Sequence, residues 1–315
     1  MGKIINNYSG KAIWLFAAVM LLAVLAACTL DETVEPASGN IEITDQLGRQ
    51  VVIDGTPQTI VSIAPGNTEI LFALGLGEKA VGVTKYCDFP AEAEEIPDVG
   101  GFSTPNIEQI VALQPDIVLA TSIHEKKIIP QLEAHNITLL GIEANDLDEL
   151  MASIAMVGQA CGVTAEAEEL ITSIQQRIDA VTAKTAGLSE ANTPGTLYVV
   201  WHDPLKVAGS ETLHDVLITT AGGRNIAAGV EGYADYSLED VIASGVEVII
   251  TSVSHGSSVD MTFEYLTSEG RLGSTAARKD SRVYRMDGNL VSRSGPRLVE
   301  GLEVFSGLIH PELFP

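Results

Sequence analysis

Short β-branched runs alternate with helical segments over two long stretches of this chain, and this alternation restricts its fold more than any other feature. At 59–64, for example, TIVSIA lies between two prolines, and helical apolar spacing follows over 67–77. Strands that are apolar on both faces belong to parallel sheets that helices cover on each side. We therefore predict an α/β fold.

The middle of the chain interrupts this alternation. Apolar residues recur there at spacings of three and four, with one break at Gly162-Val163, and we place a linking helix at 148–187. This helix separates an N-terminal α/β lobe at 41–147 from a C-terminal α/β lobe at 195–315. Two such lobes enclose a cleft, where ligands usually bind.

One helix-strand pattern occurs in both predicted lobes. EQIVALQPDIVLA at 108–120 and EDVIASGVEVIIT at 239–251 match at most positions in apolar or acidic character, and each begins with a glutamate. The match predicts lobes of similar topology. The alternative is coincidence between two generic α/β sequences.

The first 27 residues differ from the rest. Lys3 and Lys11 precede a 16-residue apolar run, 12–27, which is shorter than the ~20 residues of a spanning helix. This is typical of a secretory signal peptide at 1–27. LAAC at 25–28 resembles a bacterial lipobox, which predicts lipidation at Cys28; an uncleaved anchor or a chance cysteine is the alternative. The acidic, polar segment 28–40 is then a flexible tether on the extracytoplasmic face of the membrane.

Charge and cysteine content exclude further classes. Removal of two lysines with the signal peptide leaves 16 basic against 42 acidic residues, a net charge of −26, which argues against nucleic acid as a partner. Cys87 and Cys161 are too few for a disulfide framework. One bridge between them is conceivable, but we expect two free, buried thiols.

Four segments carry a resemblance to a known family. They are SIAPGNTEILFALGLG, KYCDFPAEAEEIPDVGGF, NIEQIVALQPDIVLA and SLEDVIASGVEVII. In this order and spacing they resemble the substrate-binding proteins of ABC importers for iron-siderophores, haem and cobalamin, and most resemble the cobalamin-binding members. Ala64 and Phe89 depart from the usual serine and tyrosine. The resemblance implies two Rossmann-like lobes joined by a single long rigid helix, with a shallow ligand cleft between the lobes and little hinge closure.

The first lobe offers candidate ligand contacts at the carboxyl end of its first strand, where open α/β sheets bind ligands. Gly66, after Pro65, would let a flat ligand approach the backbone, and we expect Asn67 to cap the next helix. A turn and cap without a ligand is the alternative. By resemblance, Tyr86 presents its ring and hydroxyl to the ligand, and Phe102 stands where cobalamin proteins place a cleft tryptophan; ordinary core packing is its alternative role.

In the second lobe, Trp201 and His202 end a predicted strand and should overhang the cleft. Trp201 would stack on a ring, and His202 would bond a ligand amide or a metal, although a structural histidine is the commoner case. Tyr233 and Arg293 occupy further family positions, with Arg293 as a hydrogen-bond donor. Arg297, in contrast, is expected to anchor the last helix.

Catalysis finds little support in the sequence. The polar loop at 255–260 contains a histidine and two serines, but the chain has no G-x-S-x-G elbow. His124, His202, His214 and His255 lack the paired spacing of a transition-metal site. We predict neither a catalytic residue nor a metal site nor a bound cofactor.

The resemblance therefore implies a lipid-anchored binding protein that captures a corrinoid, such as cobalamin, and delivers it to the permease dimer and ATPase of an ABC importer. It also implies that Glu108 and Glu239 dock to the two halves of that permease; helix capping is their alternative role. Two alternatives for the function remain: an iron-siderophore or haem on the same scaffold, and a chelatase-like enzyme acting on tetrapyrroles.

Overall fold

The computed structural model describes residues 39–253 and 260–315. The predicted signal peptide at 1–27, the predicted lipidation site Cys28 and all but the last two residues of the predicted tether at 28–40 lie outside the described residues, as does His255. Among the described residues, no helix combines the length and the apolar character needed to cross a membrane.

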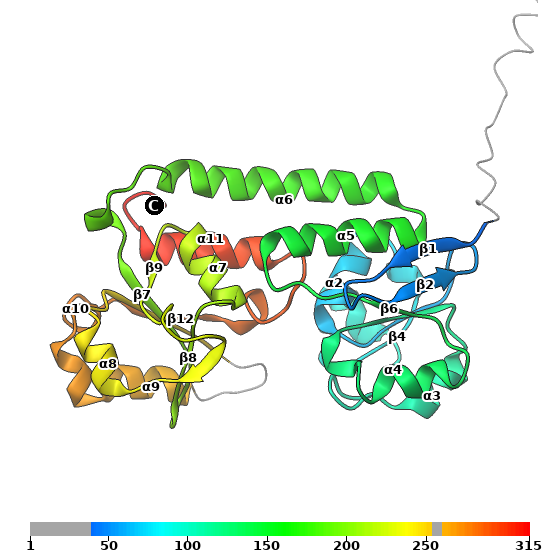
Figure 1. Ribbon diagram of the computed structural model, residues 1–315, viewed down its shortest axis with the longest axis horizontal. Helices are drawn as coiled ribbons and strands as arrows, with labels where there is room; N and C mark the ends of the chain where they lie inside the picture. Colours follow the sequence, from blue (N-terminus) through cyan, green and yellow to red (C-terminus); the bar gives the residue numbers. More distant parts are fainter. Residues whose placement is uncertain (1–38, 254–259) are drawn as a thin grey trace, which may run out of the picture. The chain divides into compact units, whose positions relative to one another are not determined.

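The N-terminal lobe contains a parallel sheet in the order β4-β3-β5-β6, which confirms the predicted α/β class for this part (Figure 1). An antiparallel hairpin precedes the sheet. The strands are β1 (Ile41–Thr44), β2 (Gln50–Ile53), β3 (Ile60–Ser62), β4 (Ala80–Val83), β5 (Ile117–Ala120) and β6 (Leu139–Gly141). The helices are α2 (Pro65–Ala73), α3 (Ile107–Leu113), α4 (Ile128–Glu133) and the 3-10 turns η1 (Gly77–Lys79), η2 (Ala91–Glu95) and η3 (Ser122–His124).

The C-terminal lobe contains a sheet in the order β10-β8-β7-β11-β12, with β9 beside β7. The strands are β7 (Gly195–His202), β8 (Leu205–Ala208), β9 (Arg224–Asn225), β10 (Tyr233–Asp235), β11 (Val248–Val253) and β12 (Val283–Asp287). The helices are α7 (Leu213–Thr220), α8 (Leu238–Ala243), α9 (Met261–Ser268), α10 (Ala276–Lys279), α11 (Leu298–Ile309) and the 3-10 turns η4 (Glu190–Asn192), η5 (Gly270–Ser274) and η6 (Gly288–Leu290).

This second sheet is mixed, whereas the sequence pattern predicts parallel strands. β7, β9, β11 and β12 are parallel, but β8 and β10 are antiparallel to their neighbours. The difference arises because β7 turns back at Asp203-Pro204 into β8 instead of leading directly into a helix. An antiparallel edge on a mostly parallel sheet is common in α/β folds.

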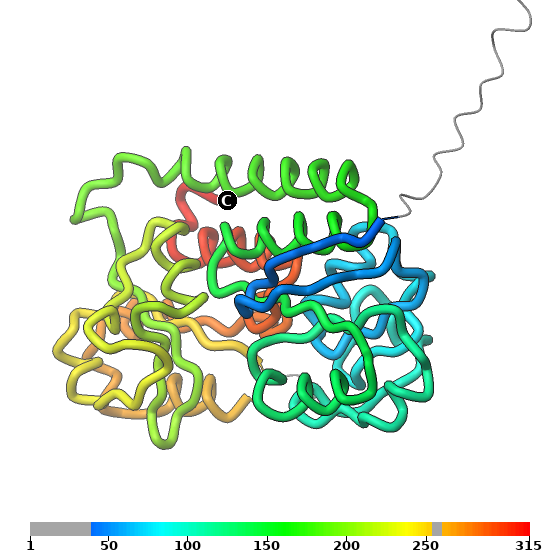
Figure 2. The backbone as a smooth tube through the Cα atoms, turned by 45° about the vertical axis from the view of Figure 1, so that its right-hand side comes forward, coloured from blue at the N-terminus to red at the C-terminus, as the bar shows by residue number. Residues whose placement is uncertain are grey.

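The linking segment 148–187 contains two helices rather than one. α5 (Leu147–Cys161) ends at Gly162, whose φ of 71° is left-handed, and the chain reverses into α6 (Thr164–Thr185). The two helices pack side by side, and α6 extends over both lobes (Figures 1 and 2). The predicted break at Gly162-Val163 is thus a full reversal, because glycine there acts as a C-cap, and α6 is the long helix that joins the lobes.

A single buried apolar cluster runs through both lobes. It includes Ile60 of β3, Ile154 of α5, Ile178 of α6, Ile250 of β11 and Phe305 of α11. A hinge motion of one lobe against the other would separate close-packed side chains. The shared core therefore opposes closure.

The repeated sequence pattern forms the same unit twice, as predicted. α3 leads to β5, and α8 leads to β11. Each helix has a capping side chain, since Asn106 accepts from the N–H of Gln109 and Ser237 accepts from the N–H of Asp240. Consequently Glu108 and Glu239 are both the second residue of their helix, and both are exposed.

Candidate ligand-binding site

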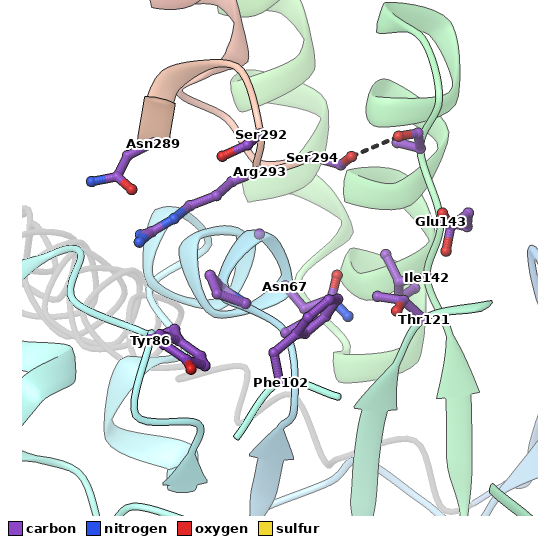
Figure 3. Close-up of a pocket in the computed structure, with 14 residues that line it drawn as sticks. Asn67, Tyr86, Phe102, Thr121, Ile142, Glu143, Asn289, Ser292, Arg293 and Ser294 are labelled. Carbon is purple, nitrogen blue, oxygen red and sulfur yellow. Dashed lines mark hydrogen bonds between the residues drawn. The ribbon is translucent and has the colours of Figure 1, made fainter. Parts of the chain in front are cut away.

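A cavity of about 360 Å³, here called the main cavity, lies where strands of the N-terminal sheet end and a loop of the C-terminal lobe meets them (Figure 3). Its lining comes from the segments after β3, β4, β5 and β6 and from the segment 289–294 after β12. The residues that line it are Ala64, Pro65, Gly66, Asn67, Tyr86, Phe102, Thr121, Ile142, Glu143, Ala144, Asn289, Ser292, Arg293 and Ser294. This is the carboxyl edge of the sheet, where the sequence analysis places the ligand.

Asn67 lines the main cavity, but the prediction that it caps α2 is wrong. Ala64 occupies the N-cap position, Pro65 begins the helix, and Asn67 lies in its first turn. The side chain is buried, and its Nδ2 donates to the carbonyl of Ala120 at 3.3 Å. Because proline is favoured in the first turn of a helix, Pro65 already indicated a cap one residue before it.

Gly66 makes a close backbone contact of a different kind from the predicted one. A Cβ at this position would lie 2.7 Å from the carbonyl oxygen of Ser294. The missing side chain thus makes room for the loop of the C-terminal lobe. Ser294 is also held by its hydroxyl, which donates to the carbonyl of Ala144 at 2.6 Å, so the two lobes are joined at the edge of the main cavity.

Tyr86 and Phe102 give the main cavity its aromatic surface. Tyr86 is 39% exposed and Phe102 is half-buried. Figure 3 shows both rings at the N-terminal side of the cavity, opposite Arg293 and Asn289. The two residues therefore provide apolar surface that a planar ligand can cover.

His124 supports this wall from behind. It is fully buried, and its Nδ1 accepts from the N–H of Thr121 at 3.0 Å. Nε2 therefore carries the proton and donates to the carbonyl of Phe102 at 2.6 Å, while the Phe102 and His124 rings meet edge to face. Burial lowers the pKa of His124, so the ring is neutral. This residue holds two cavity-lining residues in place.

Arg293 lines the main cavity, but its charge is compensated by the protein. Its Nη1 donates to Asp88 and lies 3.6 Å from Glu69. Glu69 in turn accepts two hydrogen bonds from Arg297. Burial raises the pKa of Glu69, and the two arginines oppose this shift. These four side chains form an ion-pair cluster that links α2 and the segment after β4 to the loop before α11.

A second cavity, of about 380 Å³, lies at the carboxyl edge of the C-terminal sheet and shares Ser292 with the main cavity. Its lining residues are Tyr198, Val200, His214, Tyr233, Ser252, Val253, Gly288 and Ser292. The shared residue makes the two cavities neighbouring parts of one cleft. Tyr233 thus lies on the second wall of the cleft, as the resemblance implies.

The polar side chains of the second cavity are linked to one another. Tyr233 OH lies 3.1 Å from Nδ1 of His214, and Tyr198 OH donates to Ser252 at 2.7 Å. The Tyr198 and His214 rings are 3.8 Å apart. Burial lowers the pKa of His214 to about 3 and raises the pKa of Tyr198. This wall is therefore uncharged at neutral pH.

Trp201 and His202 lie at the end of β7, as predicted, but neither lines the two cavities. Trp201 is 42% exposed, and its Nε1 donates to the carbonyl of Asp203 at 2.9 Å. His202 Nδ1 lies 3.2 Å from the Thr262 hydroxyl. Both residues belong to the β7-β8 hairpin, outside the lining of the two cavities.

Several residues that line the main cavity were not predicted from the sequence. Thr121 directly follows β5, and Ile142, Glu143 and Ala144 directly follow β6. The rule that placed Pro65–Asn67 after β3 would have found them had it been applied to every strand. Asn289 and Ser292 lie in the loop after β12, which the family motifs marked only through Arg293.

Other expectations concern cysteines and metals. Cys87 and Cys161 are both free and buried, as expected. Across residues 39–253 and 260–315, no group of three or more His, Cys, Asp or Glu side chains is arranged to hold a metal ion.

Comparisons with known proteins agree with this geometry. The sequence pattern of the family described as periplasmic binding protein matches residues 60–290. An uncharacterised ABC transporter substrate-binding lipoprotein of Bacillus subtilis (strain 168) is 31% identical, over 96% of this chain and 99% of the relative. A cobalamin-binding protein of Halobacterium salinarum (strain R1) is 26% identical, over 90% of this chain and 75% of the relative.

A solved structure shows the same fold. The periplasmic haem-binding protein of Pseudomonas aeruginosa superposes with a TM-score of 0.72 at 29% identity, covering 81% of this chain and 93% of that one. The resemblance inferred from the motifs is thereby confirmed at the level of the family, and the chelatase alternative loses its support. This chain belongs to the periplasmic binding protein family, a family of binding proteins rather than enzymes that includes ABC transporter substrate-binding proteins.

Proposed function

We propose that this protein captures a corrinoid such as cobalamin and delivers it to the permease of an ABC importer. The observation that carries the proposal is the charge of the main cavity. Arg293 is the cation that lines it within the described part of the chain, and Asp88 compensates that cation. A cleft built for a carboxylate ligand would instead offer an unpaired cation.

The other polar residues that line the main cavity suit a ligand that carries amide groups around its edge. Asn289, Ser292 and Thr121 offer amide and hydroxyl groups, which both donate and accept hydrogen bonds. The side-chain amides that surround a corrin ring need both kinds of partner. Tyr86 and Phe102 on one wall and Tyr233 on the other provide apolar surface for the macrocycle. The cobalamin-binding relative from Halobacterium supports the same ligand class.

Haem is the second candidate, for one specific reason. Tyr86 and Tyr233 bring phenol groups to the cleft, and a phenolate oxygen is a known axial ligand of haem iron. The haem-binding structure from Pseudomonas supports the same alternative. The paired state of Arg293 weighs against it, because haem carries two carboxylates.

The same family supports a proposal for the partner and the location. The Bacillus relative is named as a substrate-binding lipoprotein of an ABC transporter. We accordingly propose lipidation at Cys28, tethering through 28–40 at the extracytoplasmic face, and docking of Glu108 and Glu239 to the two halves of the permease. The matching position of these glutamates in α3 and α8 supports the docking proposal, since a near-symmetric partner needs one charge presented twice.

A direct titration tests the ligand. Residues 29–315 contain a single tryptophan, Trp201, whose fluorescence overlaps corrin and haem absorption. The soluble protein from residue 29 is titrated with cyanocobalamin, haem and a ferric siderophore, with calorimetry as a second readout. Saturable one-to-one quenching by cyanocobalamin at micromolar or lower concentration supports the proposal. Binding of haem or the siderophore without any binding of cyanocobalamin overturns it.

A further inference from the structure

The segment 86–89 directs four consecutive side chains to four different places. Tyr86 lines the main cavity, whereas Cys87 is buried with its Sγ 3.1 Å from the hydroxyl of Thr68. Asp88 accepts from Arg293, and the Phe89 ring lies under the guanidinium of Arg297 at 3.8 Å. The buried thiol and the stacked ring fix the backbone on both sides of Asp88, so its carboxylate is held against Arg293.

Asp88 pairs with a cation of the main cavity without lining that cavity itself. Two charged residues line the main cavity in the described part of the chain, Arg293 and Glu143. The second carboxylate near Arg293 is that of Glu69, at 3.6 Å, but it accepts both of its short hydrogen bonds from Arg297. Asp88 is therefore the carboxylate hydrogen-bonded to Arg293, whereas Glu69 is shared between the two arginines.

We propose that Asp88 is the charge selector of the ligand site: by compensating Arg293 it makes the cavity accept amide groups and reject carboxylates at this wall. The inference rests on the proposed function for the ligand class. With Asp88 in place, a ligand carboxylate beside Arg293 would meet a guanidinium that already faces two carboxylates, those of Asp88 and, at 3.6 Å, Glu69. Charges a few ångströms apart at a partly buried site interact strongly enough to change affinity on the order of tenfold.

Two pairs of ligands test how a carboxylate on the ligand affects binding. Cyanocobalamin is compared with its monocarboxylic acid derivatives, in which one side-chain amide is hydrolysed, and haem is compared with its dimethyl ester. In each pair the shape is nearly constant and the charge differs. The wild-type protein is expected to bind the uncharged member about tenfold more tightly, and the ratio is expected to fall with added salt.

Asp88→Asn is the decisive variant. It keeps the size of the side chain and leaves Arg293 with only Glu69, at 3.6 Å and shared with Arg297, so the preference for the uncharged ligand should shrink about tenfold or reverse. Asp98→Asn is the matched control, since Asp98 accepts from the N–H of Gly100 and belongs to the same lobe. The ratio of its affinities for the uncharged and the charged ligand should equal that of the wild type.

Arg293→Gln provides the opposite change. It removes the cation to which Asp88 is hydrogen-bonded, so discrimination against the acid should increase. An Asp88→Asn protein that folds but keeps the wild-type ratio overturns the inference. If Asp88→Asn does not fold, an unchanged ratio in Arg293→Gln overturns it instead. A further outcome separates the two proposals. If the protein binds no cobalamin, but Asp88→Asn changes its relative affinity for haem and haem dimethyl ester, the charge selector is supported and the proposed ligand is overturned.

Discussion

Arg297 holds Glu69 through two hydrogen bonds, Nε to Oε2 at 3.0 Å and Nη2 to Oε1 at 2.5 Å, although 228 residues separate them in the chain. Glu69 belongs to α2 of the N-terminal lobe, and Arg297 stands at the start of α11. From its place in the sequence, Arg297 is predicted to anchor the last helix. The structure shows that the anchor lies in the other lobe, so this pair connects the two halves of the molecule.

Breaking this pair should destabilise the protein strongly. Arg297→Met leaves the buried Glu69 carboxylate without its main partner, and we expect a loss of about 3–5 kcal/mol in the free energy of unfolding. Arg177→Met is the control, because Arg177 and Glu303 form an exposed pair that should contribute less than about 1 kcal/mol. Urea denaturation measures both. Equal losses in the two variants would contradict the prediction.

Gly66→Ala should disturb the junction between the lobes. The new Cβ would lie 2.7 Å from the carbonyl oxygen of Ser294, so the loop 292–295 must move, at an expected cost of about 1–3 kcal/mol. Gly273→Ala is the matched control, since nothing lies within 4 Å of a Cβ there. Thermal melting compares them. A Gly66→Ala protein as stable as Gly273→Ala would show that the loop yields freely.

Acid should destabilise the folded protein through two histidines. Burial lowers the pKa of His124 below 6.5 and that of His214 to about 3. Below pH 6.5 the unfolded chain therefore binds protons that the folded chain does not. Their stabilising contribution is complete above pH 6.5 and is lost as the pH falls, for His214 until about pH 3, with a slope of up to about 1.4 kcal/mol per pH unit for each residue.

Variants separate the contribution of the histidines to the pH dependence of stability from that of the carboxylates. His214→Phe should show a shallower slope of unfolding free energy against pH between pH 6 and 4 than the wild type, whatever its absolute stability. His135→Phe is the control, because His135 is exposed. Identical slopes for all three proteins would contradict the assignment.

Aromatic substitutions should separate cavity residues from surface ones. Phe102→Ala removes apolar surface from the main cavity and should weaken ligand binding by roughly five- to thirtyfold, which corresponds to about 1–2 kcal/mol for a partly buried ring. Trp201→Phe should change affinity less than about twofold, because Trp201 lines neither cavity. Calorimetry is the measurement, since Trp201→Phe removes the fluorophore. A large loss in Trp201→Phe would place the ligand at the β7-β8 hairpin instead.

The two docking glutamates are tested by transport. Glu108→Ala combined with Glu239→Ala should leave ligand affinity unchanged and reduce uptake by cells at least tenfold, because both carboxylates are exposed and neither lines a cavity. Glu239 also lies 3.7 Å from Arg271. Arg271→Ala is therefore the control for the loss of that pair alone, and it should retain uptake. Normal uptake by the double variant would contradict the docking role.

Local sequence patterns determined the class and the organisation of this protein. Buried strands, amphipathic helices and the first-strand motif at 65–67 are each visible within a dozen residues, because side-chain periodicity depends on neighbours along the chain. The repeated unit with Glu108 and Glu239 is visible when two such short segments are compared. Ordered motifs were sufficient for the family as well. Six of the nine predicted ligand residues line the main cavity, and Tyr233 lines the second.

The tertiary structure alone decided which side chains meet. Gly66 lies against Ser294, and Asp88 is paired with Arg293. Trp201 belongs to a hairpin that no local pattern marked, and it lines neither cavity. The sequence determined the elements and the lobes because hydrophobic periodicity is a local property. The pairing of charges and the shape of the site belong to the packing of segments about 200 residues apart, and only the folded chain brings those segments together.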